Sequence, residues 1–307
     1  MHTIFLFFTV LSSSFALAGS SFLQTSPFTI SSGSSTVVCV TEVSNHVSVV
    51  LMGQLGNQLF QIATAYAYAL DHQTPLLVPD LVNNKAFNIP HNKKILFQDR
   101  INSQKIPWVA NRWKEPSFNY SPIPSLPNLE LFGYFQSEKY FKHRRQELLE
   151  LFKAPQGLNE KILTKYPFLA SDAFVVGIQI RDYRQERPLG DYHPTKTRSY
   201  YETAMSYFPE DTIFLVSSNN LALAQECTEG VSPNIIYLSA DYIEEFYTLV
   251  LCKSFIIANS SFGWWASWLS TAQNKTVIAP SVWFAPPYNN EYMTRDIFPE
   301  GCTLINE

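Results

Sequence analysis

The sequence predicts an α/β fold in which two Rossmann-like, doubly wound domains face each other across a cleft. Short and almost wholly apolar runs recur along the second half of the chain, and helix-compatible segments separate them. Continuous apolarity indicates strands buried on both faces, and regular alternation with helices indicates a parallel sheet. The length of 307 residues is more than one hydrophobic core usually supports, so we expect two domains.

The composition is that of a folded globular protein. Apolar residues make up 46 % of the chain and charged residues 16 %, so we expect disorder only near the ends. The formal net charge of -4 gives no overall attraction to nucleic acid or to an anionic membrane surface. We therefore expect no nucleic-acid partner, and we expect any phosphate group to be bound by a few placed residues.

The four cysteines, Cys39, Cys227, Cys252 and Cys302, stand alone in the sequence. None belongs to a CxxC motif or has a neighbouring His at ligand spacing, so the pattern predicts neither a zinc site nor a thioredoxin motif. Buried thiols are the simplest interpretation. Two disulfides remain open if the chain is exported, because the number of cysteines is even.

The N-terminus has the pattern of a secretory signal. An apolar run at residues 4–11 is followed by serines and by Ala16 and Ala18 in the A-x-A cleavage pattern. We expect residues 1–18 to be a signal peptide or an uncleaved anchor, and residues 19–46 to be a disordered spacer. The protein is then in the secretory pathway or associated with a membrane through its N-terminus; a cytoplasmic location is the alternative.

The first α/β unit begins at residue 47. The run "VSVVLM" at residues 47–52 predicts a strand. Apolar residues at helical spacing over residues 59–70 predict a helix, and "PLLVP" at residues 75–79 predicts the next strand.

A polar segment with five prolines follows, so we expect a long surface loop over residues 106–127 with neither helix nor central strand. The run "LELFGYF" predicts a strand at residues 129–135, and helical spacing predicts a helix over residues 138–152. A domain boundary after this helix divides the chain into a first domain of residues 47–165 and a second of residues 166–307.

The second domain repeats the same alternation of apolar runs and helix-compatible segments. The predicted strands are residues 173–181, 212–218, 234–239, 254–259 and 275–280. The predicted helices are residues 200–208, 220–227, 243–252 and 262–271.

Polar residues follow several of these strands where a parallel sheet binds its ligands, beyond the carboxyl ends. Gly53 and Gly56 follow the first strand; they either let a ligand approach or allow a tight turn and close helix packing. Arg181 closes an apolar strand with a forked cation suited to phosphate, or it forms half of an interdomain ion pair. The segment "NSS" at residues 259–261 starts a helix, whose free N–H groups and dipole favour anions.

Several motifs together carry a family resemblance. "GQLGNQLFQIA" and "LFGYFQSEKYF" lie in the first domain, and "VGIQIRDY", "LVSSNN" and "CKSFIIANSSFGWWASWL" follow in the second. In this order they resemble the motifs of the α1,2-fucosyltransferases, glycosyltransferase family 11. The resemblance covers about residues 47–284.

The resemblance implies a GT-B type fold and the transfer of L-fucose from GDP-fucose to the 2-hydroxyl of a terminal galactoside. Residues 47–165 would face the galactose-terminated glycan acceptor, and residues 166–307 would bind GDP-fucose. Transfer would invert the anomeric centre, with no covalent intermediate, cofactor or metal ion. The sequence agrees in one respect, because it contains no DxD, a motif that metal-dependent sugar-nucleotide enzymes commonly use.

By the family pattern, Arg181 stabilises the departing diphosphate, helped by the helix start at residues 259–261. Asp182 is our candidate for the general base, with Asp191 as the alternative. The expected substrate-binding residues are Gly53, Gly56, Asn57, Gln58, Gln136, Ser217, Ser218, Asn219, Asn259, Ser260, Ser261 and Phe262. The glycines would let the backbone reach the sugar nucleotide, while Asn57 and Gln58 hydrogen-bond it.

The chain departs from the family pattern at two places. The family His is Gln179 here, and "VSSNN" replaces a segment that carries two carboxylates in the family. These departures keep three alternatives open: a catalytically weak relative that binds a GDP-sugar or a glycan, an enzyme for a different GDP-sugar, and a protein O-fucosyltransferase.

Overall fold

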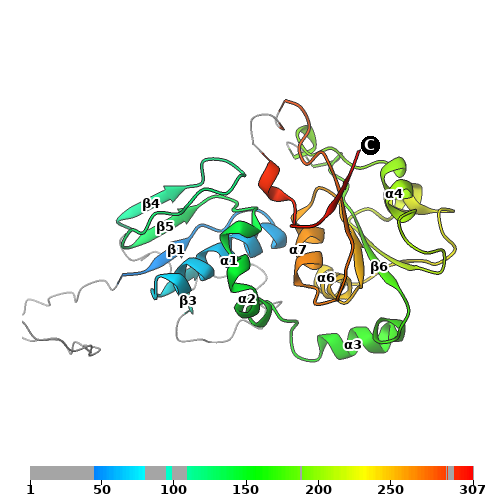
Figure 1. Ribbon diagram of the computed structural model, residues 1–307, viewed down its shortest axis with the longest axis horizontal. Coiled ribbons are helices and arrows are strands. Elements are labelled where there is room, and N and C mark those ends of the chain that lie inside the picture. The colour runs from blue at the N-terminus through cyan, green and yellow to red at the C-terminus, as the bar shows by residue number, and fades with distance from the viewer. Residues whose placement is uncertain are drawn as a thin grey trace, which may run out of the picture. The chain divides into compact units, whose positions relative to one another are not determined.

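The computed structural model describes residues 45–79, 95–98, 109–186, 189–287, 289 and 294–306 (Figure 1). The expected signal or anchor and most of the expected spacer lie outside these residues, so they stay predictions. The end of the spacer at residue 46 is wrong. His46 is 3 % exposed and its backbone carbonyl accepts a hydrogen bond from Leu129, so it belongs to the fold.

The first sheet has the strand order β3-β2-β1-β5-β4, and all its neighbouring strands are parallel. Its strands are β1 (Val47–Val49), β2 (Leu76–Pro79), β3 (Ile95–Gln98), β4 (Asn111–Lys114) and β5 (Leu129–Phe132). The expectation of a loop throughout residues 106–127 is wrong at β4, while the expectation of no central strand holds for the described residues. This strand lies at the edge of the sheet and its residues alternate between half-buried and exposed, a pattern too short to stand out beside the prolines.

Helix α1 (Leu55–Asp71) connects β1 and β2, and most of its residues are buried. Four alanines at every second position, from Ala63 to Ala69, are at most 6 % exposed. Small side chains on several sides of the helix allow close packing against the sheet and against other segments.

The helix expected over residues 138–152 is interrupted. It consists of two short 3-10 helices, η3 (Glu138–Tyr140) and η4 (Lys142–Arg144), followed by α2 (Arg145–Leu151). Phe141 lies between them with φ -145° and ψ -5°, outside the helical region. Its ring is fully buried and stacks on Trp265 at 5.3 Å between centroids. The free energy gained by burying this ring against Trp265 outweighs the preference of the local sequence for a continuous helix.

The second sheet has the strand order β11-β10-β9-β6-β7-β8, again with all neighbours parallel. Its strands are β6 (Val175–Ile180), β7 (Ile213–Ser218), β8 (Ile235–Tyr237), β9 (Ser254–Ile256), β10 (Val277–Pro280) and β11 (Thr303–Ile305). The five strands predicted for this domain are confirmed. β11 follows them as a further edge strand.

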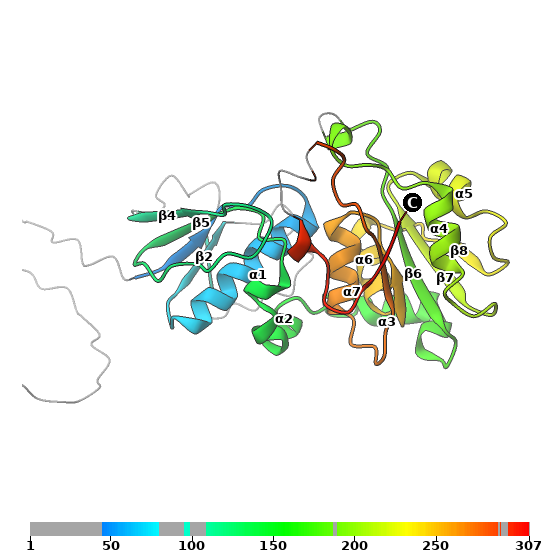
Figure 2. The ribbon, with the colours of Figure 1, turned by 45° about the horizontal axis from the view of Figure 1, so that its top comes forward.

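Helices cover both faces of this sheet, which confirms the doubly wound arrangement (Figure 2). Helices α4 (Arg198–Met205) and α5 (Leu221–Thr228) pack with Val176, Ile178 and Ile180 of β6 in one core cluster. Helices α6 (Tyr242–Val250) and α7 (Ser261–Leu269) belong to the cluster on the other face. Helix α3 (Leu158–Lys165) connects the two sheets along the chain.

Helix α7 also contacts α1, so the two sheets share one apolar core (Figure 1). Trp264 and Trp265 are fully buried. The ring of Phe60 in α1 lies 4.4 Å from Trp264 and 5.1 Å from Trp265 between centroids. Large aromatic side chains thus hold the starts of both helices in a fixed relation.

The cysteines of the described residues are free thiols. Cys227 and Cys252 are buried and Cys302 is half-buried, while Cys39 lies outside the described part of the chain. Among the helices that the structure describes, none combines the length and the apolarity needed to cross a bilayer.

Candidate active site

The predicted site residues gather around one cavity of about 740 Å³. It opens where α1 begins and where several strands of the second sheet end. Every residue predicted from the sequence to bind substrate lines it, and so does Arg181: Gly53, Gly56, Asn57, Gln58, Gln136, Arg181, Ser217, Ser218, Asn219, Asn259, Ser260, Ser261 and Phe262. Asp182 does not.

Strand order arranges the cavity residues of the second sheet in a row, because parallel strands end at one edge. Residues 283–284 follow β10, residues 259–262 follow β9, and residues 181–183 follow β6. Residues 217–219 end β7, and Tyr242 and Glu245 follow β8. From β6 the chain continues to β7 on one side of the sheet, and from β9 it continues to β10 on the other side. The boundary between β6 and β9, in the middle of the row, is therefore the switch point where such sheets bind ligands.

Gly56 makes room for α7. A Cβ atom at Gly56 would lie 2.5 Å from the carbonyl carbon of Ser261 and 2.7 Å from its oxygen. We expected this missing side chain to admit the sugar nucleotide. At Gly56 the structure supports the alternative, close helix packing, because the backbone of Ser261 fills the space and the glycine brings the starts of α1 and α7 together.

Asn57 connects three segments of the cavity wall. Its Oδ1 accepts hydrogen bonds of 2.8 Å from Gln136 Nε2 and of 2.8 Å from Ser261 Oγ. Gln58 instead donates from Nε2 to the carbonyl oxygen of Gly53 at 3.1 Å. Gly53 has a φ of +73°, which favours glycine, so this turn depends on it.

The start of α7 is capped by the side chain of Ser260 and held in place by hydrogen bonds of the buried Asn259. Ser260 Oγ accepts a hydrogen bond from the backbone N–H of Phe262 at 3.4 Å. Asn259 donates from Nδ2 to the carbonyl oxygen of Trp283 at 2.9 Å, and its own carbonyl oxygen accepts from the Tyr183 hydroxyl at 3.1 Å. The first N–H groups of a helix carry partial positive charge, so this rigid end is suited to an anion.

Arg181 lies beside the same helix end with its side chain 15 % exposed. Its Nη2 is 2.6 Å from the carboxylate of Glu186, and its guanidinium carbon is 5.1 Å from the centre of the Tyr183 ring. The ion pair is local, five residues along the chain, and among the described residues Arg181 forms no ion pair with the first domain. An incoming phosphate would compete with a single partly exposed carboxylate for this cation.

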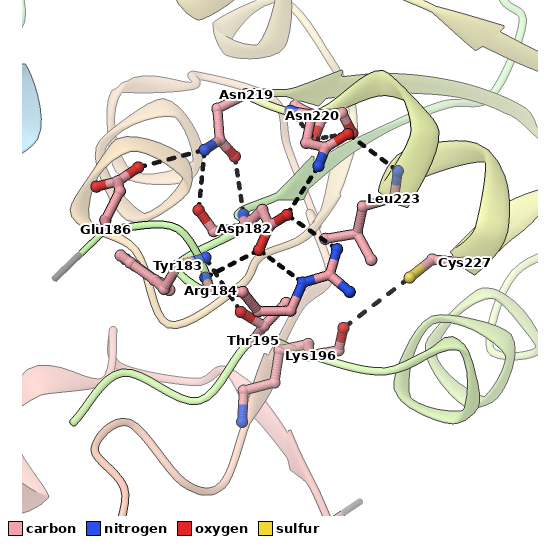
Figure 3. Close-up of polar contacts among 11 residues, drawn as sticks. Asp182, Tyr183, Arg184, Glu186, Thr195, Lys196, Asn219, Asn220, Leu223 and Cys227 are labelled. Atoms are coloured by element: carbon pink, nitrogen blue, oxygen red, sulfur yellow. Dashed lines mark hydrogen bonds and ion pairs between the residues drawn. The ribbon is translucent and has the colours of Figure 1, made fainter. Parts of the chain in front are cut away.

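Hydrogen bonds within the protein occupy the carboxylate of Asp182, so it is a poor candidate for the general base (Figure 3). Its Oδ1 accepts hydrogen bonds from the backbone N–H of Arg184 at 3.0 Å and from Arg184 Nε at 2.9 Å. Its Oδ2 accepts hydrogen bonds from Arg184 Nη2 at 2.9 Å and from Asn220 Nδ2 at 2.8 Å. The bonds to Arg184 hold the pKa of this carboxyl well below its usual range. Asp191, the alternative, is exposed and does not line the cavity either.

The predicted donor contacts at the end of β7 have internal partners. Asn219 exchanges hydrogen bonds of 2.8 and 2.9 Å with the Asp182 backbone (Figure 3). Ser217 Oγ donates to Glu245 Oε2 at 2.6 Å, and Ser218 Oγ donates to the carbonyl oxygen of Asn220 at 2.9 Å. These side chains fix the positions of β6, β7 and α6 at the cavity wall.

Glu245 is a cavity residue that the sequence reasoning missed. Besides the bond from Ser217, its Oε1 accepts from the Ala240 backbone at 3.3 Å. Burial raises the pKa of this carboxyl. Its position in the first turn of a helix that follows a strand is the signal that could have found it. A half-buried carboxylate here can accept hydrogen bonds from paired N–H groups of a ligand.

Buried oxygen atoms around the cavity have no hydrogen-bond partner among the described residues. They belong to four side-chain amides that are each at most 7 % exposed: Gln58, Gln136, Gln179 and Asn259. An unpaired buried acceptor is costly, so water or a ligand hydroxyl must pair with these atoms. The cavity is therefore suited to a ligand that carries many hydroxyl groups.

His193 is a further cavity residue that the sequence reasoning missed. Burial lowers its pKa to about 4, and the nearby charge of Arg181 lowers it as well. Its ring is therefore neutral at neutral pH and adds no cation to the site. Aromatic side chains surround His193 in the cavity wall. Two aromatic cavity residues, Trp283 and Phe284, could have been predicted from the sequence because they follow a strand.

Glu115 supports the turn that presents Gln136 to the cavity. Its Oε2 accepts hydrogen bonds of 2.8 Å from the backbone N–H groups of Tyr134 and Phe135, and Phe135 has a φ of +54°. Burial raises the pKa of Glu115 to about 7. The folded protein therefore holds this proton to a higher pH than the unfolded chain does.

We expect Glu115→Gln to remove a pH dependence of stability. The raised pKa stabilises the folded state below about pH 4.5, and this contribution is lost as the pH rises through 7. Between pH 4.5 and 8, the free energy of unfolding of the parent should fall by about 3 kcal/mol relative to the variant. Urea unfolding of both proteins at these pH values measures it; a constant difference would contradict the prediction.

Comparison with known proteins adds the following. The sequence profile of Glycosyl transferase family 11 matches residues 34–302. The O-antigen biosynthesis glycosyltransferase WbnK of Escherichia coli is 27 % identical over 287 residues, which cover 76 % of this chain and 94 % of that protein. The Alpha-1,2-colitosyltransferase of Escherichia coli is 24 % identical over 287 residues, 84 % of this chain and 98 % of that protein. Galactoside alpha-(1,2)-fucosyltransferase 2 of Oryctolagus cuniculus is 26 % identical over 71 % of this chain, which spans 65 % of its length.

Solved structures with a similar fold include two fucosyltransferases. The NodZ alpha-1,6-fucosyltransferase soaked with GDP-fucose has a TM-score of 0.51 and 13 % identity over 74 % of this chain and 92 % of that one. A mutant of Arabidopsis thaliana FUT1 in complex with GDP has a TM-score of 0.51 and 14 % identity over 76 % of this chain and 70 % of that one. The chain has the GT-B type of fold that the sequence predicted.

Proposed function

The chain belongs to glycosyl transferase family 11, and on this premise we propose that it is a galactoside α1,2-fucosyltransferase. It would transfer L-fucose from GDP-fucose to the 2-hydroxyl of a terminal galactoside. One observation carries the proposal. In the cavity, the Arg181 guanidinium and the start of α7 lie between the Glu245 carboxylate at one end and aromatic side chains at the other.

The nucleotide half of the donor fits the side of the cavity formed by β7, β8 and α6. Guanine presents N–H donors on its ring and amino nitrogens, and Glu245 offers an acceptor for them. Tyr242, 46 % exposed at the cavity, offers a ring for stacking. The diphosphate then reaches Arg181 and the start of α7 in the middle of the row.

The reaction is a displacement with inversion at the anomeric carbon. The oxygen of the acceptor hydroxyl forms a bond to this carbon and gives up its proton to water or to the departing diphosphate. At the same time the bond from this carbon to the diphosphate oxygen breaks and leaves its electron pair on GDP. Negative charge grows on the diphosphate as the bond breaks, so fixed donors aimed at it stabilise the transition state more than the ground state. We propose that Arg181 and the α7 amides supply this stabilisation and that no divalent ion is required.

The likeness to the colitosyltransferase favours a second candidate function, transfer of colitose to a hydroxyl. A catalytically weak relative that binds GDP-sugars is a third, because Gln179 and the serines and asparagines after β7 replace groups that carry charge in the family. Protein O-fucosyl transfer is the least supported, because the family match covers residues 34–302, which include nearly all of the described fold.

The test is an assay of the purified protein with a terminal β-galactoside and, in parallel, GDP-fucose or GDP-colitose, each with and without a chelator. We expect an α1,2-linked fucoside, determined by NMR, at a rate that the chelator does not change. Transfer from GDP-colitose alone would assign the second candidate, and binding of GDP without product would assign the third. Activity that returns only with added magnesium or manganese would contradict metal independence.

A further inference from the structure

Aromatic rings form a continuous wall across the cavity, from the first sheet to the second. This aromatic wall consists of Tyr134, Phe118, Phe284, His193 and Tyr183, all of which line the cavity. Successive ring centroids are 5.9, 5.0, 4.9 and 4.7 Å apart in that order. Tyr134 and Phe118 come from the first sheet and its proline-rich loop, and the other three follow β10 and β6.

The wall is largely preformed. Phe118 and Tyr134 stack with an angle of 19° between their planes, and Tyr183 and His193 with an angle of 17°. Phe284 is 3 % exposed and Tyr183 is 6 % exposed, so packing holds both rings in place. A ligand that binds to fixed rings loses less side-chain entropy than one that must order them.

The position of the wall separates it from the nucleotide. In the strand order of the second sheet, Phe284 follows β10, while Glu245 and Tyr242 follow β8, on the other side of Arg181 and the α7 start. A diphosphate in the middle of the row has the nucleoside on one side and the transferred sugar on the other. The Phe284 end of the aromatic wall is therefore on the side where the acceptor must meet that sugar, while Tyr183 at its other end lies beside Arg181.

The chemistry of the wall fits a sugar ring. The faces of aromatic rings carry negative charge and attract weakly positive C–H groups. A β-galactoside presents several C–H groups on one face of its ring, because its 4-hydroxyl is axial and points to the opposite face. Unpaired side-chain oxygens of Gln58 and Gln136 lie in the same cavity and can accept hydrogen bonds from sugar hydroxyls.

We propose that the aromatic wall is the acceptor subsite and that it binds the terminal galactoside through the apolar face of its ring. This inference rests on the proposed function. It extends the expectation that residues 47–165 face the acceptor, since three of the five rings come from the second half of the chain. Acceptor recognition would then require both sheets.

The test compares Phe284→Leu, which keeps apolar volume but removes the ring, with Tyr242→Ala at the nucleotide end. We expect Phe284→Leu to raise the acceptor KM about 3- to 10-fold and to leave the Kd for GDP unchanged. Tyr242→Ala should raise the Kd for GDP, measured by calorimetry, and leave the acceptor KM unchanged. Phe118→Leu tests the other half of the wall with the same expectation as Phe284→Leu.

Phe174→Leu is the matched control, because Phe174 is 37 % exposed and does not line the cavity. It should change neither constant, and thermal unfolding of each variant shows whether it is folded. If the parent transfers fucose but Phe284→Leu and Phe118→Leu leave the acceptor KM unchanged, or raise the Kd for GDP instead, the subsite is wrong and the proposed function stands. If the parent transfers no sugar, the proposed function fails, and this inference fails with it.

Discussion

Replacing Arg181 with alanine should lower kcat about 100- to 1000-fold, which is the effect of removing one preorganised donor from a developing anion. The guanidinium is 15 % exposed beside the start of α7, where water screens charge poorly. The loss should appear mainly in kcat, because charge on the diphosphate grows as the bond to the sugar breaks. Steady-state kinetics with saturating GDP-fucose measure it.

Two further variants separate charge from geometry. Arg181→Lys keeps the positive charge but loses the forked donor, so its kcat should lie between those of Arg181→Ala and the parent. Glu186→Gln removes the negative charge that competes with phosphate for Arg181, so GDP should bind the variant at least as tightly as the parent. A kcat that Arg181→Ala leaves within threefold of the parent would exclude this residue from leaving-group stabilisation.

Gly56→Ala should damage both stability and activity, although alanine is the better helix former by about 1 kcal/mol. The new Cβ would lie 2.5 Å from the carbonyl carbon of Ser261, a backbone atom that moves only with α7 itself. We expect a loss of about 1 to 3 kcal/mol in unfolding free energy. We also expect roughly 100-fold lower activity in the folded fraction, because the anion-binding helix end is displaced.

Gly230→Ala is the control for backbone strain. Gly230 has a φ of +77°, and the position that a Cβ atom would take there lies in open space, so alanine should cost some stability but no activity. Equal loss of activity in both variants would show that Gly56→Ala acts through a general loss of stability rather than through displacement of α7. Gly56→Ala with full activity would contradict the packing account.

The strands of the second sheet could be predicted because each is a continuous apolar run, and the cavity followed from the rule that ligands bind beyond strand ends. The general base could not be predicted, because the identity of Asp182 does not reveal its partner Arg184 two residues away. Similarly, Phe141 interrupts a helical pattern by packing on Trp265, a contact between distant parts of the chain. Gly56 stands out in the sequence, but only the structure shows that α7 fills the space beside it.

Cavity residues outside the motifs were missed for a related reason. Glu245 and His193 follow no spacing rule, and their chemistry depends on burial that the sequence does not display. Phe118 and Tyr134 come from a proline-rich segment and a turn, and only the meeting of the two sheets places their rings beside Phe284.

A crystal structure with bound GDP tests the central claim most directly. We predict the β-phosphate within hydrogen-bond distance of the Arg181 guanidinium and of the first backbone N–H groups of α7, with guanine beside Glu245. A diphosphate bound elsewhere, or held through a divalent ion with Arg181 still paired to Glu186, would contradict the account.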